Sequence, residues 1–130
     1  MKIKQLSIFM ENKVGTINEV ISIISEAGIS LRAFSVADGI EFGILRIIVR
    51  PENLLRTQQV IEDAGFKVNQ TDVLCVEVPN VAGGISTVLS DLAKEDVFIQ
   101  YMYSFSDAET ASVIIRPNDI DRCIGVLSSR

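Results

Sequence analysis

Two asparagines at the entrances of two similar short segments are the side chains best suited to holding a small polar ligand. Asn12 is followed by Gly15, and Asn80 by Gly83, at the same spacing of three. An Asn amide offers donors and an acceptor, so each could bridge between a ligand and nearby backbone. Each Asn has a second interpretation, as a helix cap or an Asx turn. The glycines stay open in the same way, because a permissive turn and the close approach of a ligand both favour Gly.

Catalytic chemistry has little to draw on in this chain. There is no histidine, the side chain that acid–base catalysis uses most often. The neighbouring carboxylates at 62–63 and 95–96 fall towards predicted helix ends and are interpreted as solvated surface. Cys75 and Cys123 lie far apart with no C-x-x-C, which predicts reduced packing residues rather than a disulfide or metal ligands. We therefore expect no enzyme activity, no metal and no cofactor.

Composition and charge narrow the partners. The chain has 130 residues, 48% of them hydrophobic, and a formal net charge of −5. No Lys/Arg cluster with interleaved aromatics is present, so a nucleic-acid partner is not expected. Glu11 interrupts the N-terminal segment before an apolar run reaches signal-peptide length, and no stretch of about 18 uncharged apolar residues follows. We expect a cytoplasmic protein without a membrane partner.

The chain repeats itself at a shift of 68 residues. Residues 12–17 (NKVGTI) return as residues 80–85 (NVAGGI). Apolar residues alternate before each loop, which predicts half-buried strands, at Leu6, Ile8 and Met10 and again at Leu74, Val76 and Val78. After each loop they recur with helical spacing, which predicts amphipathic helices, at Ile17, Val20, Ile21 and Ile24 and again at Ile85, Val88, Leu89 and Leu92.

The rest of each copy predicts a hairpin and a second helix. Residues 44–51 return as 112–117 at a shift of 66, so the second hairpin is predicted to be two residues shorter. Pro51 and Pro117 are expected to mark the start of the second helix. A fourth strand beginning near residue 65 runs directly into the second copy, which places one module at 1–70 and the other at 71–130. The second copy has no residues left for a fourth strand of its own.

Strand, N-x-x-G-x-[I/L] loop, amphipathic helix, hairpin and second helix together resemble the ACT domain, over nearly the whole chain. The resemblance implies an α+β fold of two tandem ferredoxin-like βαββαβ modules. Each module has an antiparallel sheet with helices on one face, and the second lacks its last strand. Because strand order in such a sheet is 4-1-3-2, the first strand of the second module would then be an unpaired edge. We expect this edge to meet another strand or another chain.

The resemblance also implies a regulatory protein that binds an amino acid where ACT modules pair, at the loops and the facing second strands. The start of each first helix could hold the ligand carboxylate through backbone N–H groups. Val14 and Ala82 stand where the family often has Pro, and the Gly83-Gly84 pair leaves more room than Gly15-Thr16, so the two half-sites are expected to differ. The candidate ligand-binding residues are Asn12, Val14, Gly15, Thr16, Ile17, Ala33 and Ser35 in the first copy and Asn80, Ala82, Gly83, Gly84, Ile85, Tyr101 and Met102 in the second.

Three choices stay open at this point. Aromatic residues around Tyr101 would favour an apolar or aromatic amino acid, or they are ordinary strand packing. The chain is a ligand sensor, or a ligand-free accessory subunit that docks on a separate metabolic enzyme. If Leu45 faces the helices, then Ile48, Ile114 and Phe9 lie on the opposite sheet face, and a homodimer covering that face is expected. Neither the amino acid nor the regulated enzyme follows from the sequence.

Overall fold

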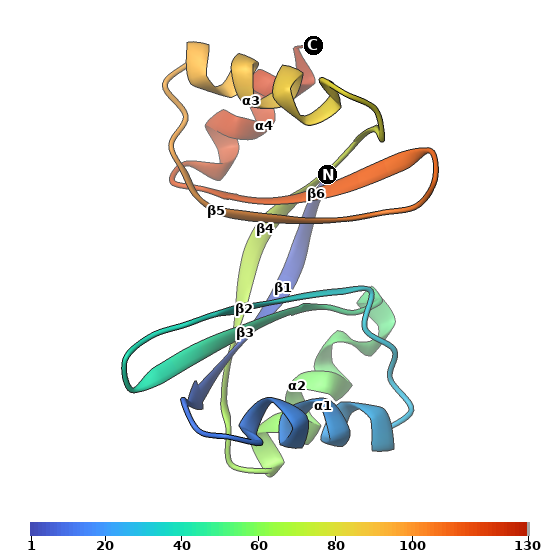
Figure 1. The fold of residues 1–130 in the computed structure, drawn as a ribbon, viewed down its shortest axis with the longest axis vertical. Coiled ribbons are helices and arrows are strands. Elements are labelled where there is room, and N and C mark those ends of the chain that lie inside the picture. Colours follow the sequence, from blue (N-terminus) through green and yellow to red (C-terminus); the bar gives the residue numbers. More distant parts are fainter. Residues whose placement is uncertain (130) are drawn as a thin grey trace. The chain divides into compact units, whose positions relative to one another are not determined.

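The computed structural model of the protein describes residues 1–129 and divides into two compact units (Figure 1). The N-terminal unit is Lys4–Thr71. The C-terminal unit runs from Asp72 onward and also contains Met1–Ile3. Each unit is described by itself below.

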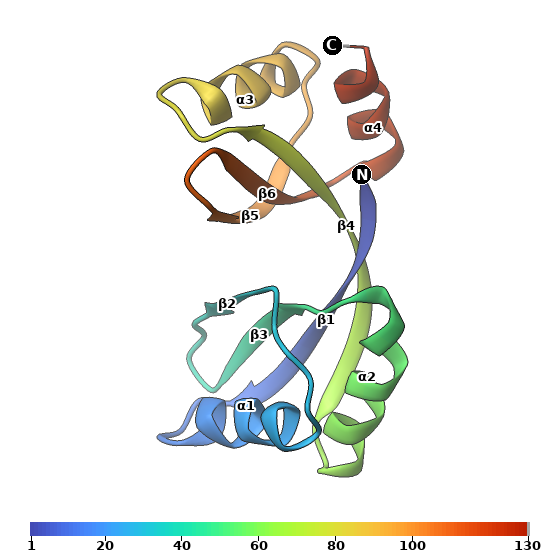
Figure 2. The ribbon, with the colours of Figure 1, turned by 90° about the vertical axis from the view of Figure 1, so that its right-hand side faces the viewer.

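The N-terminal unit contains a four-stranded antiparallel arrangement in the order β2-β3-β1-β4. Two helices, α1 and α2, lie on one face of these strands (Figure 2). The elements are β1 (Lys2–Glu11), α1 (Thr16–Glu26), β2 (Ala33–Ala37), β3 (Phe42–Ile48), a 3-10 turn (Pro51–Asn53), α2 (Leu54–Asp63) and the beginning of β4 (Lys67–Pro79).

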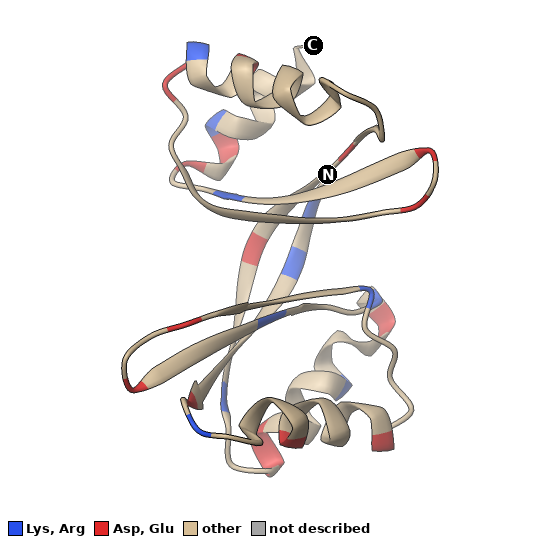
Figure 3. Cartoon of the chain, viewed as in Figure 1, with Lys and Arg blue, Asp and Glu red and all other residues tan. Residues whose placement is uncertain are grey.

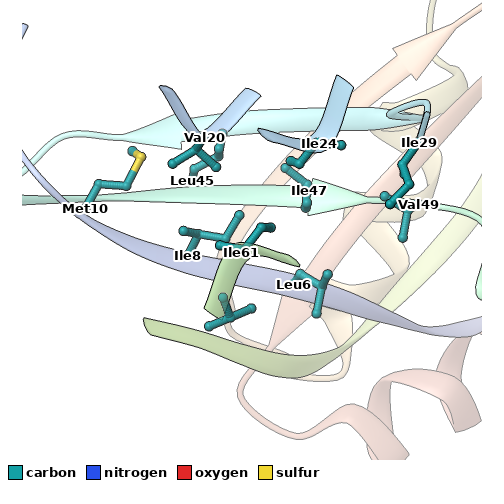
Figure 4. Close-up of a cluster of buried hydrophobic side chains, with 11 residues drawn as sticks. Leu6, Ile8, Met10, Val20, Ile24, Ile29, Leu45, Ile47, Val49 and Ile61 are labelled. Atoms are coloured by element: carbon teal, nitrogen blue, oxygen red, sulfur yellow. The ribbon is translucent and has the colours of Figure 1, made fainter. Parts of the chain in front are cut away.

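The core of the N-terminal unit follows from two periodicities. Alternation along β1 and β3 places every second side chain on the helix face, and the register pairs Leu6 with Ile47 and Ile8 with Leu45. In the helix, residues four apart share a face, so Val20 and Ile24 are both buried. Burial of each such Leu or Ile contributes about 1.5–3 kcal/mol. Figure 4 shows this cluster, with Leu6, Ile8, Leu45, Ile47, Val20, Ile24 and Ile61 among its members.

The C-terminal unit repeats this plan. Its strands beyond the first are ordered β4-β6-β5, and α3 and α4 lie on one face of them (Figure 1). Cys123 is buried in its core, and that burial raises the pKa of the thiol, as befits a packing residue. The elements are the remainder of β4, α3 (Gly84–Lys94), β5 (Ile99–Ser106), β6 (Thr110–Pro117) and α4 (Ile120–Ser128). The predicted fold class, two ferredoxin-like modules with antiparallel strands, is confirmed, and no further strand follows α4 up to residue 129.

The first residues of β1 occupy the place of the missing strand in the C-terminal unit. The backbone N–H of Cys75 donates to the carbonyl oxygen of Met1 at 2.7 Å. Lys2 Nζ lies 3.8 Å from Asp72 Oδ2 in the same unit. The expectation that the exposed edge meets another strand is therefore confirmed, and that strand comes from the same chain.

The prediction of a shorter second hairpin is wrong. Leu6 pairs with Ile47 and Leu74 with Ile115, so the shift of 68 persists through the third strand. Pro117 does not open a helix, because it still pairs with Ile99 at the end of β6. The two missing residues fall between that strand and α4, where Asp119 caps the helix by accepting from the Arg122 N–H at 3.1 Å. Aligning the two prolines misled the sequence argument, since a strand end also tolerates Pro.

On the sheet face opposite the helices, Ile48 and Ile114 are 3% and 0% exposed in the single chain. Neither belongs to the clusters under the helices, in agreement with the face assigned to them from sequence. Phe9 is half-buried. Coverage of this face by a second chain stays a prediction.

Candidate functional site

The loop asparagines tie each loop to its neighbouring hairpin. The Asn12 amide Nδ2 donates to Asp38 Oδ1 and to the Gly39 carbonyl, each at 2.9 Å. Asn80 Nδ2 donates to the Asp107 carbonyl at 2.8 Å. These bonds support the structural interpretation of both side chains. In Asn12 both amide hydrogens are committed, so only Oδ1 is left to accept a hydrogen from a ligand.

Left-handed glycines open the first helix of each unit. Gly15 has φ +88° and Gly83 has φ +86°, a region that disfavours residues with a Cβ. Neither α1 nor α3 has a side-chain cap within the described chain. The N–H groups of Ile17 and Asn18 in the first turn of α1 have no intrahelical acceptor and sit at the positive end of the helix dipole. These amides suit a carboxylate.

Gly84, which corresponds to Thr16, is required by close packing of the backbone. A Cβ at this position would lie 2.3 Å from the Pro79 carbonyl oxygen. The second glycine of the pair therefore lets the loop approach the end of β4, rather than leaving the room for a ligand that the sequence suggested.

A narrow hollow of about 160 Å³ lies in the N-terminal unit between the β1–α1 loop and the end of β2. Among the residues predicted from sequence, Asn12, Thr16 and Ile17 line it. Val36 and Asp38 line it too, although the sequence argument did not choose them. We call this cavity the narrow hollow.

Ala33 and Ser35 do not line the narrow hollow, because they lie on the other face of β2. Val36 pairs with Leu45, whose side chain is in the helix-facing core, while Ser35 pairs with Arg46. The signal that identifies Val36 is this alternation, counted from the apolar residues of the neighbouring strand.

A wide hollow of about 690 Å³ lies at the end of the same unit's sheet, where β1 ends and β4 begins. Val14, Gly15 and Thr16 line this cavity, which we call the wide hollow. The predicted residues of the first loop are thus divided between two cavities, one on each side of the loop.

In the C-terminal unit, a cavity of about 640 Å³ is lined by Ala82, Gly83 and Gly84. Asn80, Ile85, Tyr101 and Met102, the other predicted residues, do not line it. Met102 packs against the helix-facing core and Tyr101 pairs with Arg116. Strand packing accounts for Met102 directly.

The charges near both loops are held locally. Lys13 Nζ lies 2.8 Å from Glu11 Oε2, and this hydrogen bond, followed by the charge of Glu11, raises the pKa of Lys13. The N–H groups of Thr110 and Glu109 donate to Asp107 Oδ1 and lower its pKa. Basic and acidic residues are interspersed along both units (Figure 3). Within residues 1–129, no group of three or more His, Cys, Asp or Glu side chains is arranged to hold a metal, and no helix there could cross a membrane.

Comparison with known families decides what this repeated arrangement is. A model of the ACT domain pair matches residues 1–129. The chain belongs to the ACT domain-pair family. ACT domains are regulatory domains, and the two copies of the loop are the repeated feature of this ACT pair.

Solved structures share the fold of the ACT pair. Protein BT0572 from Bacteroides thetaiotaomicron matches with 45% identity and a TM-score of 0.90, over 99% of this chain and 88% of that one. The ligand-free regulatory subunit of aspartate kinase from Thermus thermophilus matches with 13% identity and a TM-score of 0.73, over 97% and 91%. The corresponding subunit from Thermus flavus has 14% identity and a TM-score of 0.70, over 98% and 92%. No curated protein matches the chain.

Proposed function

We propose that this ACT pair is a non-catalytic cytoplasmic regulatory protein that binds a free amino acid at its loops, with residues 1–70 and 71–130 acting as one module each. The observation that carries the proposal is the narrow hollow, which brings three kinds of group together. The amides at the start of α1 suit the ligand carboxylate. Asn12 Oδ1 and the Asp38 carboxylate suit its ammonium. Ile17 and Val36 offer apolar contact to its side chain.

We propose further that a second copy of the chain covers this site. β2 is the edge strand of the N-terminal unit, and Phe34 and Val36 on it are 60% and 46% exposed. An exposed edge with large apolar side chains is a surface that proteins usually cover. A symmetric homodimer pairing this edge would also extend the narrow hollow, which alone is small for an amino acid.

The regulated partner in this proposal is a separate metabolic enzyme. Structures named as regulatory subunits of aspartate kinase share the fold of this chain. At 13–14% identity they support the fold alone, so the enzyme class stays open. A ligand-free docking subunit is the second candidate, favoured by the asparagine amides, which the hairpins already occupy.

The test is a thermal-shift screen of the purified chain against the twenty amino acids. A ligand at 100 times its dissociation constant stabilises the folded state by about 2.7 kcal/mol. We expect a shift with one chemical group of amino acids, lost in Val36→Glu, which places a carboxylate in the narrow hollow, and retained in Phe98→Glu, a comparably exposed apolar position in the C-terminal unit. No shift with any amino acid would transfer the proposal to the docking subunit.

A further inference from the structure

The wide hollow of the N-terminal unit has a wall that the fold does not require. Three of the six phenylalanines of the chain line it, and they come from separate segments. Phe9 lies on β1, Phe42 begins β3, and Phe66 precedes β4. Phe42 is 59% exposed, an unfavourable position for a large ring unless something covers it. The volume of about 690 Å³ falls within the range of small-molecule pockets.

The positive charge in this wall is placed beside an aromatic ring. Lys67 Nζ lies 5.4 Å from the centroid of the Phe9 ring. The other lysine, Lys13, is already paired with Glu11 at 2.8 Å. The remaining carboxylate, Glu19, lies in the first turn of α1, where the helix dipole offsets its charge. Lys67 is thus the cation of the wall that is available to an incoming anion.

The C-terminal unit provides an internal comparison. Its cavity of about 640 Å³ is formed at the corresponding loop. At the shift of 68, Phe9 corresponds to Glu77, Lys13 to Val81 and Glu19 to Thr87. The wall of that cavity contains no Phe and no Lys among the described residues. The same loop and helix therefore fold without the aromatic rings and the lysine.

We propose that the wide hollow is a second binding site, separate from the narrow hollow, and that it takes a small aromatic monocarboxylate. The ligand ring lies among the phenylalanine rings in offset or edge-to-face geometry. Its carboxylate lies beside Lys67, where the neighbouring ring face and the ammonium both favour it. A phosphate or a dicarboxylate is disfavoured, because Glu11 and Glu19 stand in the same wall.

The test uses 3-phenylpropionate as the probe and isothermal titration calorimetry on the full chain. Phe42→Ser and Lys67→Gln are expected to weaken binding about tenfold each, equivalent to about 1.4 kcal/mol. Phe34→Ser is the matched control, since Phe34 is 60% exposed and lies outside the cavity, and Lys94→Gln controls for loss of a surface lysine. Circular dichroism melts check that all four variants fold.

Related probes separate the alternatives. Phenethylamine and hexanoate are expected to bind at least about tenfold more weakly than the probe, because one lacks the carboxylate and the other the ring. Equal binding of either compound, tighter binding of phenylphosphate or of L-phenylalanine, or unchanged binding in Phe42→Ser and Lys67→Gln would overturn the proposal. Val36→Glu is expected to leave the probe bound, so failure here is distinct from failure of the amino-acid site.

Discussion

Adding one methyl group at Gly84 should destabilise the C-terminal unit, although alanine is the better helix former. Gly84 begins α3, and a Cβ there would lie 2.3 Å from the Pro79 carbonyl oxygen, well inside van der Waals contact. Both contacting groups belong to the backbone, so no flexible side chain can move aside. Overpacking of this kind costs about 1–3 kcal/mol. The N-terminal unit carries Thr16 at the corresponding place, which shows that a related loop accommodates a Cβ and favours the lower part of that range.

Gly125→Ala is the matched control. Gly125 lies in α4 of the same unit, and a Cβ there would meet nothing within 4 Å. The substitution should therefore stabilise the unit by about 0.8–1.0 kcal/mol through helix propensity alone. Urea denaturation followed by circular dichroism measures both variants, and opposite signs are expected. If Gly84→Ala raised the midpoint as Gly125→Ala does, the close approach of the loop to Pro79 would be refuted.

Three further predictions concern the strand edge, the hairpin and the oligomer. Removing Met1–Ile3 should destabilise the C-terminal unit by about 1–3 kcal/mol, from the lost Cys75 hydrogen bond and partial burial, and should speed hydrogen exchange at the Cys75 amide, whereas Lys2→Ala alone should change little. Asp107 should titrate below its ordinary pKa of 3.8 in a carboxyl NMR titration, so its contribution to stability is present above that pKa and is lost as the pH falls through the lowered one; a normal or raised value would contradict the hairpin geometry. Light scattering should give the mass of two chains for the unmodified protein and of one chain for Phe34→Lys, and a monomer at every concentration would exclude the proposed dimer.

The fold could be predicted from sequence because its signals are local and occur twice. Alternation at Leu6 and Leu74 and helical spacing at Val20 and Val88 each report the buried face of an element, and the shift of 68 shows that both copies share one plan. The misplaced gap came from Pro117, a residue equally compatible with a strand end and a helix start. Only the pairing of Leu74 with Ile115, a contact between distant segments, determines where the two residues are missing.

The candidate site could be predicted only in part. Asn12 and Gly15 mark the loop, and the structure places Asn12 in the narrow hollow and Gly15 in the wall of the wide one. Which face of β2 turns towards the loop depends on the register with β3, so a shift of one residue separates Ser35 from Val36. Phe42 and Lys67 lie 31 and 56 residues from Glu11, counted as 42 − 11 and 67 − 11, and no local pattern connects them.

The place of Met1–Ile3 also determines the order in which the protein can mature. The N-terminal unit, Lys4–Thr71, is contiguous and can fold as soon as those residues leave the ribosome. The C-terminal unit joins the first residues synthesised to a strand made more than 70 residues later, as 75 − 1 gives for Cys75 and Met1, so it must close a long loop before its sheet is complete. A domain fused before Met1 would be carried to that same strand, which makes the beginning of the chain the position where a tag most directly disturbs the last unit to fold.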